Sequence, residues 1–80
     1  MKDTWEKVFE YASVPLHGTM SRKLRPGVQL QINEGKIFEG AVLFLGEFVR
    51  FTEEKDNERI NTYYDWEKIE SIRTYSKKED

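Results

Sequence analysis

A glycine inside a long apolar strand places the strongest constraint on how this chain can fold. Residues 37–45 form an extended stretch that is apolar on both faces after Glu39, and Gly40 lies inside it. Glycine weakens the interior of a strand, and its presence there often marks a tight bend. A bend in a long strand allows a small sheet to curl onto itself and close as a barrel. The sequence therefore predicts a strongly bent sheet with its corner at Gly40.

The residues before this sheet predict one short helix at residues 3–13. Asp3 and Glu6 have the spacing of a capping box, which satisfies the first backbone amides of a helix. Pro15 disfavours helical geometry at the residue before it, so the helix should end near Ser13. Apolar residues recur at helical spacing, at Trp5, Val8, Phe9 and Ala12. We interpret this stripe as a face that packs on the core.

Residues 14–27 are predicted to form an irregular connector that carries a basic cluster. Gly18 and Pro26 interrupt it, and such residues are typical of loops. The basic residues of this region, with one from the next turn, are Arg22, Lys23, Arg25 and Lys36. Only Glu34 opposes them over residues 14–36, so we expect one face of the protein to be positive.

From residue 28 the hydrophobic period changes to two, which is typical of half-buried strands. A tight turn follows at residues 33–36, where Gly35 is expected to supply a positive φ. A polar loop is expected at residues 53–58. The predicted strands are residues 28–32, 37–45, 48–52, 59–64 and 69–75. The prediction is a mostly β fold, in which the N-terminal helix precedes a five-stranded, strongly bent antiparallel small barrel over residues 28–75.

The composition limits this fold to one small domain, residues 1–80, ending in a solvated tail at residues 76–80. A chain of this length buries only about 60% of the surface that its unfolded form exposes. It has no cysteine for a disulfide or a thiolate-bound metal, so association with copies of itself is the remaining common way to add stability. No apolar run approaches the roughly 20 residues of a membrane helix, and the N-terminus lacks the apolar stretch of a signal peptide. We therefore expect a soluble, cytoplasmic protein.

An enzyme is hard to build from these residues. His17 is the only histidine and there is no cysteine, so the usual pairs of nucleophile and base are missing. The carboxylates of residues 53–58 are expected to be solvated rather than gathered around a metal. We predict no catalytic residue, no metal site and no cofactor. Thirteen basic and fifteen acidic residues give a net charge of −2, which does not by itself indicate nucleic acid.

Residues 28–51 resemble the first conserved segment of the Sm-like (LSm) family, to which they align without a gap. The matching positions are Val28, Leu30, Ile32, Gly35, Phe38, Gly40, Val42, Leu45 and Val49. The resemblance implies an Sm-like small barrel, close in layout to SH3-like barrels, with an OB-type barrel as the alternative. It also implies a ring of copies that binds single-stranded RNA. The chain departs from the family at Gly46, which replaces an aspartate, at Arg50, which replaces an asparagine, and at residues 65–68, which replace the second conserved segment.

Two pairs of aromatic and cationic residues are the candidate RNA-binding residues. Phe48 matches the family position whose side chain often stacks on a base, and Arg50 follows it closely. Trp66 and Lys68 form the second pair. Aromatic faces with nearby cations are typical of sites for single-stranded nucleic acid, and the resemblance implies that both loops meet around the opening of a ring. The alternative for each pair is an aromatic residue that completes the core beside a solvated cation.

The fourth and fifth predicted strands leave open edges that suit self-association. A head-to-tail contact between the fourth strand of one copy and the fifth of the next can close a ring, and the resemblance implies a homo-oligomer of about five to seven copies. The candidate interface residues are Leu43 and Leu45, expected on the outer face of the second strand, and Ile60, Thr62, Tyr64, Ile69, Ser71 and Arg73. Two functions remain open. The first is an RNA-binding ring, and the second is a protein-interaction or scaffolding barrel without nucleotide binding.

Overall fold

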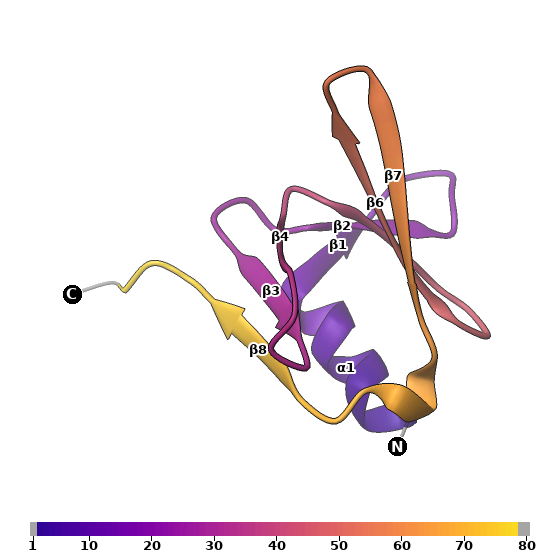
Figure 1. Cartoon of the computed structure of the whole chain (residues 1–80), viewed down its shortest axis with the longest axis vertical. Coiled ribbons are helices and arrows are strands. Elements are labelled where there is room, and N and C mark those ends of the chain that lie inside the picture. Colours follow the sequence, from indigo (N-terminus) through magenta and orange to yellow (C-terminus); the bar gives the residue numbers. More distant parts are fainter. Residues whose placement is uncertain (1, 79–80) are drawn as a thin grey trace.

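The structure, a computed structural model, describes residues 2–78, and within them the chain forms one α-helix, eight short strands and one 3₁₀ turn (Figure 1). The elements are α1 (Lys2–Ala12), β1 (Ser13–Pro15), β2 (Ser21–Leu24), β3 (Gln29–Ile32), β4 (Ile37–Glu39), β5 (Val42–Leu45), β6 (Val49–Lys55), β7 (Glu58–Tyr64), η1 (Trp66–Lys68) and β8 (Ile72–Tyr75). Every strand pairs antiparallel with its neighbours. The predicted class, mostly β with one N-terminal helix, is confirmed.

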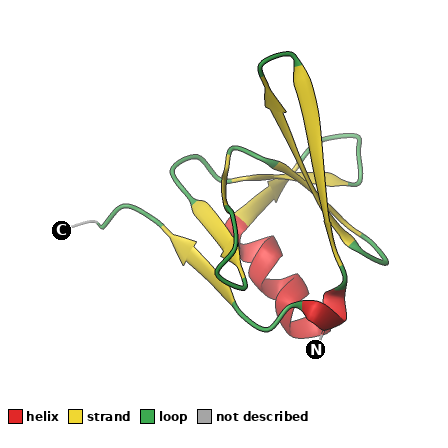
Figure 2. Ribbon diagram, in the orientation of Figure 1, coloured by secondary structure: helices red, strands yellow, loops and turns green. Residues whose placement is uncertain are grey.

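The strands form two sheets (Figure 2). One has the order β1-β2-β5-β6-β7 and the other the order β4-β3-β8. The helix α1 contacts β1, β8 and η1, so it connects the two sheets at one end of the molecule. Within residues 2–78, β7 and β8 are outer strands that do not pair with each other. The backbone hydrogen bonds therefore define two separate sheets, and within residues 2–78 no strand pairing joins them into a closed barrel.

The corner between the sheets lies at Gly40, as the sequence predicts. The expected single strand of residues 37–45 is divided there, because β4 belongs to the three-stranded sheet and β5 to the five-stranded sheet. Gly40 has a φ of +68°, a left-handed conformation that residues with a Cβ adopt at a cost. One extended segment therefore serves both sheets because a glycine interrupts it.

Substitutions at Gly40 should rank by their tolerance of positive φ. A Cβ at this position would meet no atom within 4 Å, so the cost is conformational and not steric. We expect Gly40→Ala to lower the free energy of unfolding by about 1–2 kcal/mol. Gly40→Asn should cost less, because asparagine enters the left-handed region more readily. Urea denaturation followed by circular dichroism measures both, and equal losses for the two variants would contradict this account.

Two predicted loops are part of the sheets instead. Residues 53–58 continue the hairpin of β6 and β7, whose turn is formed by Asp56 and Asn57 at φ values of 51° and 67°. Two consecutive residues of positive φ match the twist of a tight hairpin, and Asp and Asn tolerate that conformation. The turn between β3 and β4 is similar, since Asn33 and Glu34 have positive φ. The prediction that Gly35 supplies it was wrong.

The basic connector of residues 14–27 also proves to be ordered, because β1 and β2 form a hairpin that adds to the edge of β5. Its arginines bind the C-terminal end of α1. Arg22 donates to the hydroxyl of Ser13 (2.8 Å) and the carbonyl of Glu10 (3.1 Å), and Arg25 donates to the carbonyl of Tyr11 (2.9 Å). The last turn of α1 has no basic residue of its own. These arginines therefore donate hydrogen bonds to the last carbonyls of the helix and neutralise the negative end of its dipole.

The final strand is shorter than the predicted residues 69–75. The backbone amides of Glu70 and Ser71 donate to the side-chain oxygen of Asn33 (2.7 and 3.0 Å), so they are not available to a regular strand before Ile72. From there β8 pairs with β3.

The core lies between the two sheets and α1. Its centre is aromatic: Phe38 and Phe51 stack with ring centroids 4.2 Å apart, and Phe9 meets the ring of Phe51 edge-on at 5.9 Å. The buried apolar residues are Phe9, Ala12, Leu24, Leu30, Ile32, Phe38, Ala41, Leu43, Val49, Phe51, Trp66 and Ile69. The predicted apolar face of the helix is confirmed by Phe9 and Ala12, which belong to this core.

Candidate functional site

The register of β5, β6 and β7 gathers aromatic residues and one arginine on the face of the five-stranded sheet that points away from the core. Arg50 lies opposite Phe44 on one neighbouring strand and opposite Tyr63 on the other. The next residues of these strands, Leu43 and Phe51, are fully buried. Side chains alternate along a strand, so the row of Phe44, Arg50 and Tyr63 lies on the opposite face, which we call the outer face.

Phe48, in the turn between β5 and β6, extends this row. Its ring centroid lies 5.9 Å from that of Phe44 and 5.5 Å from that of Tyr63, in tilted and edge-on geometry. Phe48 is 41% exposed and Tyr63 is 58% exposed. We name Phe44, Phe48 and Tyr63 the aromatic patch. The interpretation of Phe48 as a core residue is wrong, because its ring is at the surface.

Arg50 is the cation of this patch. Its guanidinium lies 5.2 Å from the centre of the Phe44 ring, which favours a cation–π contact. Its Nε is buried and has no hydrogen-bond partner in the part of the chain that the structure describes. No carboxylate of those residues lies within 4 Å of it as a salt-bridge partner. The structure therefore brings Phe48 and Arg50 together on the outer face, where both contact Phe44.

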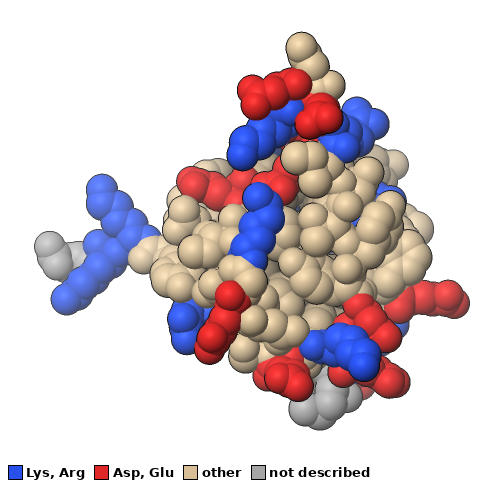
Figure 3. Space-filling view, viewed as in Figure 1, with Lys and Arg blue, Asp and Glu red and all other residues tan. Residues whose placement is uncertain are grey.

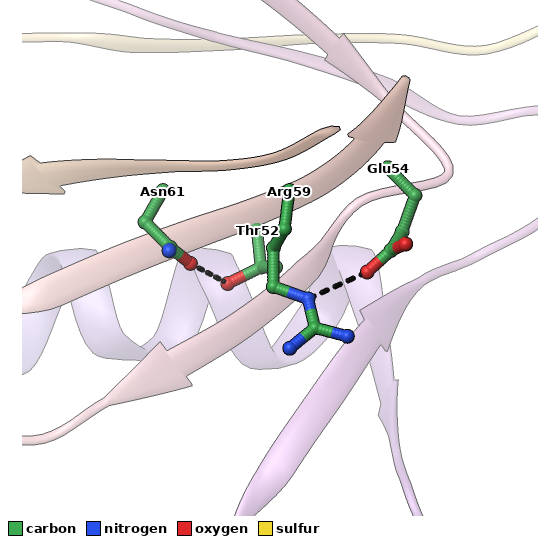
Figure 4. Close-up of polar contacts among 4 residues, drawn as sticks. All are labelled: Thr52, Glu54, Arg59 and Asn61. Atoms are coloured by element: carbon green, nitrogen blue, oxygen red, sulfur yellow. Dashed lines mark hydrogen bonds and ion pairs between the residues drawn. The ribbon is translucent and has the colours of Figure 1, made fainter. Parts of the chain in front are cut away.

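Two polar pairs lie on the outer face between the aromatic patch and the turn that joins β6 to β7 (Figure 4). Each pair has one residue on β6 and one on β7. The hydroxyl of Thr52 donates to the side-chain oxygen of Asn61 (2.7 Å), and Nε of Arg59 donates to the carboxylate of Glu54 (2.7 Å). The bond to Glu54 raises the pKa of Arg59 above its ordinary value. With Val42 and Arg50 these four residues line a shallow depression of about 380 Å³.

Trp66 does not lie at this site. It is 5% exposed, its Nε1 donates to the carbonyl of Gly46 (2.8 Å), and its ring meets Phe9 edge-on. The candidate role of Trp66 in stacking on RNA is therefore wrong, and the alternative, that the indole completes the core, is confirmed. Its bond to Gly46 also joins η1 to the turn between β5 and β6.

Lys68 is exposed on η1 and does not join the aromatic patch. The depression beside Trp66 is lined by Lys2, Glu47, Asp65, Trp66, Glu67 and Ile69, and so carries more carboxylates than cations. Carboxylates repel phosphate, so this end of the molecule is a poor surface for a nucleic acid backbone.

The predicted interface residues separate into three groups. Leu43 and Ile69 are buried in the core, so the prediction that they face a neighbouring copy is wrong; the alternation of β5 turns Leu43 inward. Leu45 and Tyr64 are half-buried and pack against that core. Burial, and to a smaller extent the charge of Glu53, raises the pKa of Tyr64. The remaining residues are at least partly exposed: Ile60 and Thr62 lie on β7, Ser71 lies just before β8, and Arg73 lies on β8.

The predicted positive face is only partly available to a ligand. Arg22 and Arg25 bind the end of α1, and Lys36 pairs with Glu53 at 3.5 Å. Figure 3 shows acidic and basic side chains interspersed over the face in view. On the outer face, by contrast, Arg50 has no acidic partner among residues 2–78, and the sequence prediction missed Phe44 and Asn61 on the same face. Phe44 lies opposite Arg50 and Asn61 lies opposite Thr52, and this register depends on the lengths of the two turns that join β5, β6 and β7.

Residues 2–78 contain no group of acidic, histidine or cysteine side chains placed to hold a metal ion, and no described helix is long and apolar enough to cross a membrane. Comparison with models of protein families gave no match, and comparisons with curated proteins and with solved structures gave no significant match.

Proposed function

We propose that this protein is a divergent Sm-like protein that binds single-stranded RNA at the aromatic patch and Arg50. One observation carries the proposal: the exposed rings of Phe48 and Tyr63 lie in the same cluster as an arginine that has no carboxylate partner among the described residues. Bases stack on exposed aromatic rings, and an adjacent cation attracts the phosphates. Both requirements of a single-stranded site are met on one face.

The charge of the chain sets the expected strength of this binding. The net charge is −2, so long-range attraction to RNA is weak and the contacts on the outer face must supply the affinity. Stacking contributes about 1–3 kcal/mol for each base. One copy should therefore bind weakly, and several copies in one assembly should bind the same RNA more tightly through avidity.

Fluorescence anisotropy of labelled uridine-rich and adenine-rich RNA tests the proposal. Phe48→Ala should weaken binding by about 1–3 kcal/mol through loss of a stacking surface. Arg50→Gln should weaken it and also reduce the dependence of log Kd on log salt by about one. The matched controls Tyr11→Ala and Lys68→Ala remove an exposed ring and an exposed cation away from the outer face and should leave the affinity unchanged. Binding that is equally weakened by the controls, or absent at low salt, refutes the proposal.

The edges of β7 and β8 favour a second function, a scaffold assembled from copies of the chain. Each strand pairs on one side only, so half of its backbone hydrogen-bonding groups face outward. Tyr64 on β7 and Ile72 on β8 are half-buried residues that pack against the core. Pairing β7 of one copy with β8 of the next would satisfy the backbone groups and cover these side chains. Repetition of this head-to-tail contact closes a ring when the rotation between copies permits it, and the resemblance to the Sm-like family implies about five to seven copies.

Light scattering on size-exclusion fractions tests the assembly. We expect an oligomer for the unaltered chain and a smaller species for Ile60→Lys, because a charged lysine opposes edge pairing. Ile37→Lys is the matched control: Ile37 is 45% and Ile60 37% exposed, but Ile37 lies on β4. A monomer of the unaltered chain at micromolar concentration would exclude the ring, and an equal effect of both lysines would exclude this interface.

A further inference from the structure

The depression below the aromatic patch has an uneven supply of hydrogen-bonding groups. Two of its acceptors are engaged within the protein: the side-chain oxygen of Asn61 accepts from Thr52, and one carboxylate oxygen of Glu54, Oε2, accepts from Nε of Arg59. Figure 4 shows the nitrogen of Asn61 and the two terminal nitrogens of Arg59 outside these contacts. The depression therefore presents several N–H donors to a ligand, and its single carboxylate is bound by Arg59.

The charge of the depression has the same sign as its donors. Arg50 and Arg59 contribute two positive charges and Glu54 contributes one negative charge, which leaves an excess of one positive charge in a protein whose total is −2. The half-buried Val42 forms an apolar part of the lining.

We infer that this depression, lined by Arg50, Arg59 and Asn61, is a binding site for a phosphate group. Guanidinium groups donate to phosphate oxygens in paired geometry, and an amide N–H₂ adds a neutral donor. Glu54 binds Nε of Arg59, and within residues 2–78 the terminal nitrogens of Arg59 make no hydrogen bond that would compete with the anion. Thr52 holds the oxygen of Asn61, which orients its N–H₂.

The phosphate site adds a position to the RNA surface, and this extension rests on the proposed function. A base stacked on the aromatic patch and a phosphate in the depression would both lie next to Arg50, because Arg50 contacts the patch and also lines the depression. The RNA would then run along β6 and β7, away from the acidic depression beside Trp66.

Inorganic phosphate is the probe for the site by itself. In ¹H–¹⁵N spectra at constant ionic strength, we expect saturable shifts of the side-chain signals of Arg50, Arg59 and Asn61. Asn61→Asp keeps the shape of the side chain and its bond from Thr52 but replaces the donors by a charged acceptor. It should weaken phosphate binding about tenfold or more. Asn57→Asp makes the same change at the turn of this hairpin, outside the lining of the depression, and should bind as the unaltered chain does.

A second pair of probes compares uridine 5′-monophosphate with uridine. The nucleotide should shift the signals of Arg59 and Asn61, which lie in the depression and outside the aromatic patch, and the nucleoside should not. No shift with phosphate, equal weakening by Asn57→Asp, or unaltered binding by a folded Asn61→Asp protein would each overturn the site. The two proposals fail differently. If the protein binds phosphate but not RNA, the phosphate site stands and the proposed function is refuted. If it binds RNA and Asn61→Asp does not weaken that binding, the proposed function stands and the phosphate site is refuted.

Discussion

Phe51→Ala is expected to lower the free energy of unfolding by about 3–5 kcal/mol. Phe51 is fully buried at the centre of the aromatic core, stacked on Phe38 and in edge contact with Phe9. Replacing such a phenylalanine with alanine costs about 3–5 kcal/mol, because transfer free energy is lost and a cavity remains. A domain of 80 residues has a total stability of only about 4–12 kcal/mol. The substitution therefore removes a large share of it.

Phe48→Ala is the matched control for this experiment, since the same atoms are removed from a ring that is 41% exposed. Its loss should stay near 1 kcal/mol or below. Urea denaturation followed by circular dichroism and by tryptophan fluorescence gives both free energies of unfolding. Equal losses for the two variants would mean that Phe51 is not in the centre of the core.

Trp66→Ala is expected to destabilise the fold by a similar amount, about 3–5 kcal/mol. The indole is buried against Phe9 and its N–H is bonded to the carbonyl of Gly46. Trp66→Phe keeps most of the ring and loses this bond, so it should cost about 1–3 kcal/mol. Thermal and urea unfolding of both variants gives the two values.

RNA binding by folded Trp66→Phe separates a structural role from a binding role. If Trp66 only stabilises the core, the affinity for RNA stays that of the unaltered chain while the stability falls. A variant of unchanged stability and weakened RNA binding would instead return Trp66 to the binding surface.

Much of the architecture could be predicted from local patterns. The helical spacing of the apolar residues before Ser13 and the alternation after residue 28 correctly indicated one helix followed by strands, although several strand bounds differ, because each pattern depends only on neighbours in the sequence. The bend at Gly40 could be predicted for the same reason. The hairpin of β1 and β2 could not, because its strands are short and polar and are held by distant partners, β5 and the end of α1.

The candidate site was harder to predict because it depends on register. Phe48 and Arg50 are close in sequence, but Phe44 and Tyr63 reach them only through the pairing of three strands. A shift of one residue would have turned Phe44 to the core and Leu43 to the surface. The prediction made this error for Leu43, which it placed at an interface between copies.

The contacts of Arg22 and Arg25 have a consequence for how the chain folds. An isolated helix of eleven residues is marginal in water, and the short hairpin of β1 and β2 would be equally weak alone. Because Arg22 and Arg25 bind the terminal carbonyls of α1, the hairpin and the helix are each more ordered when the other is present. Residues 2–25 should therefore gain and lose protection against amide hydrogen exchange together, as a single cooperative unit.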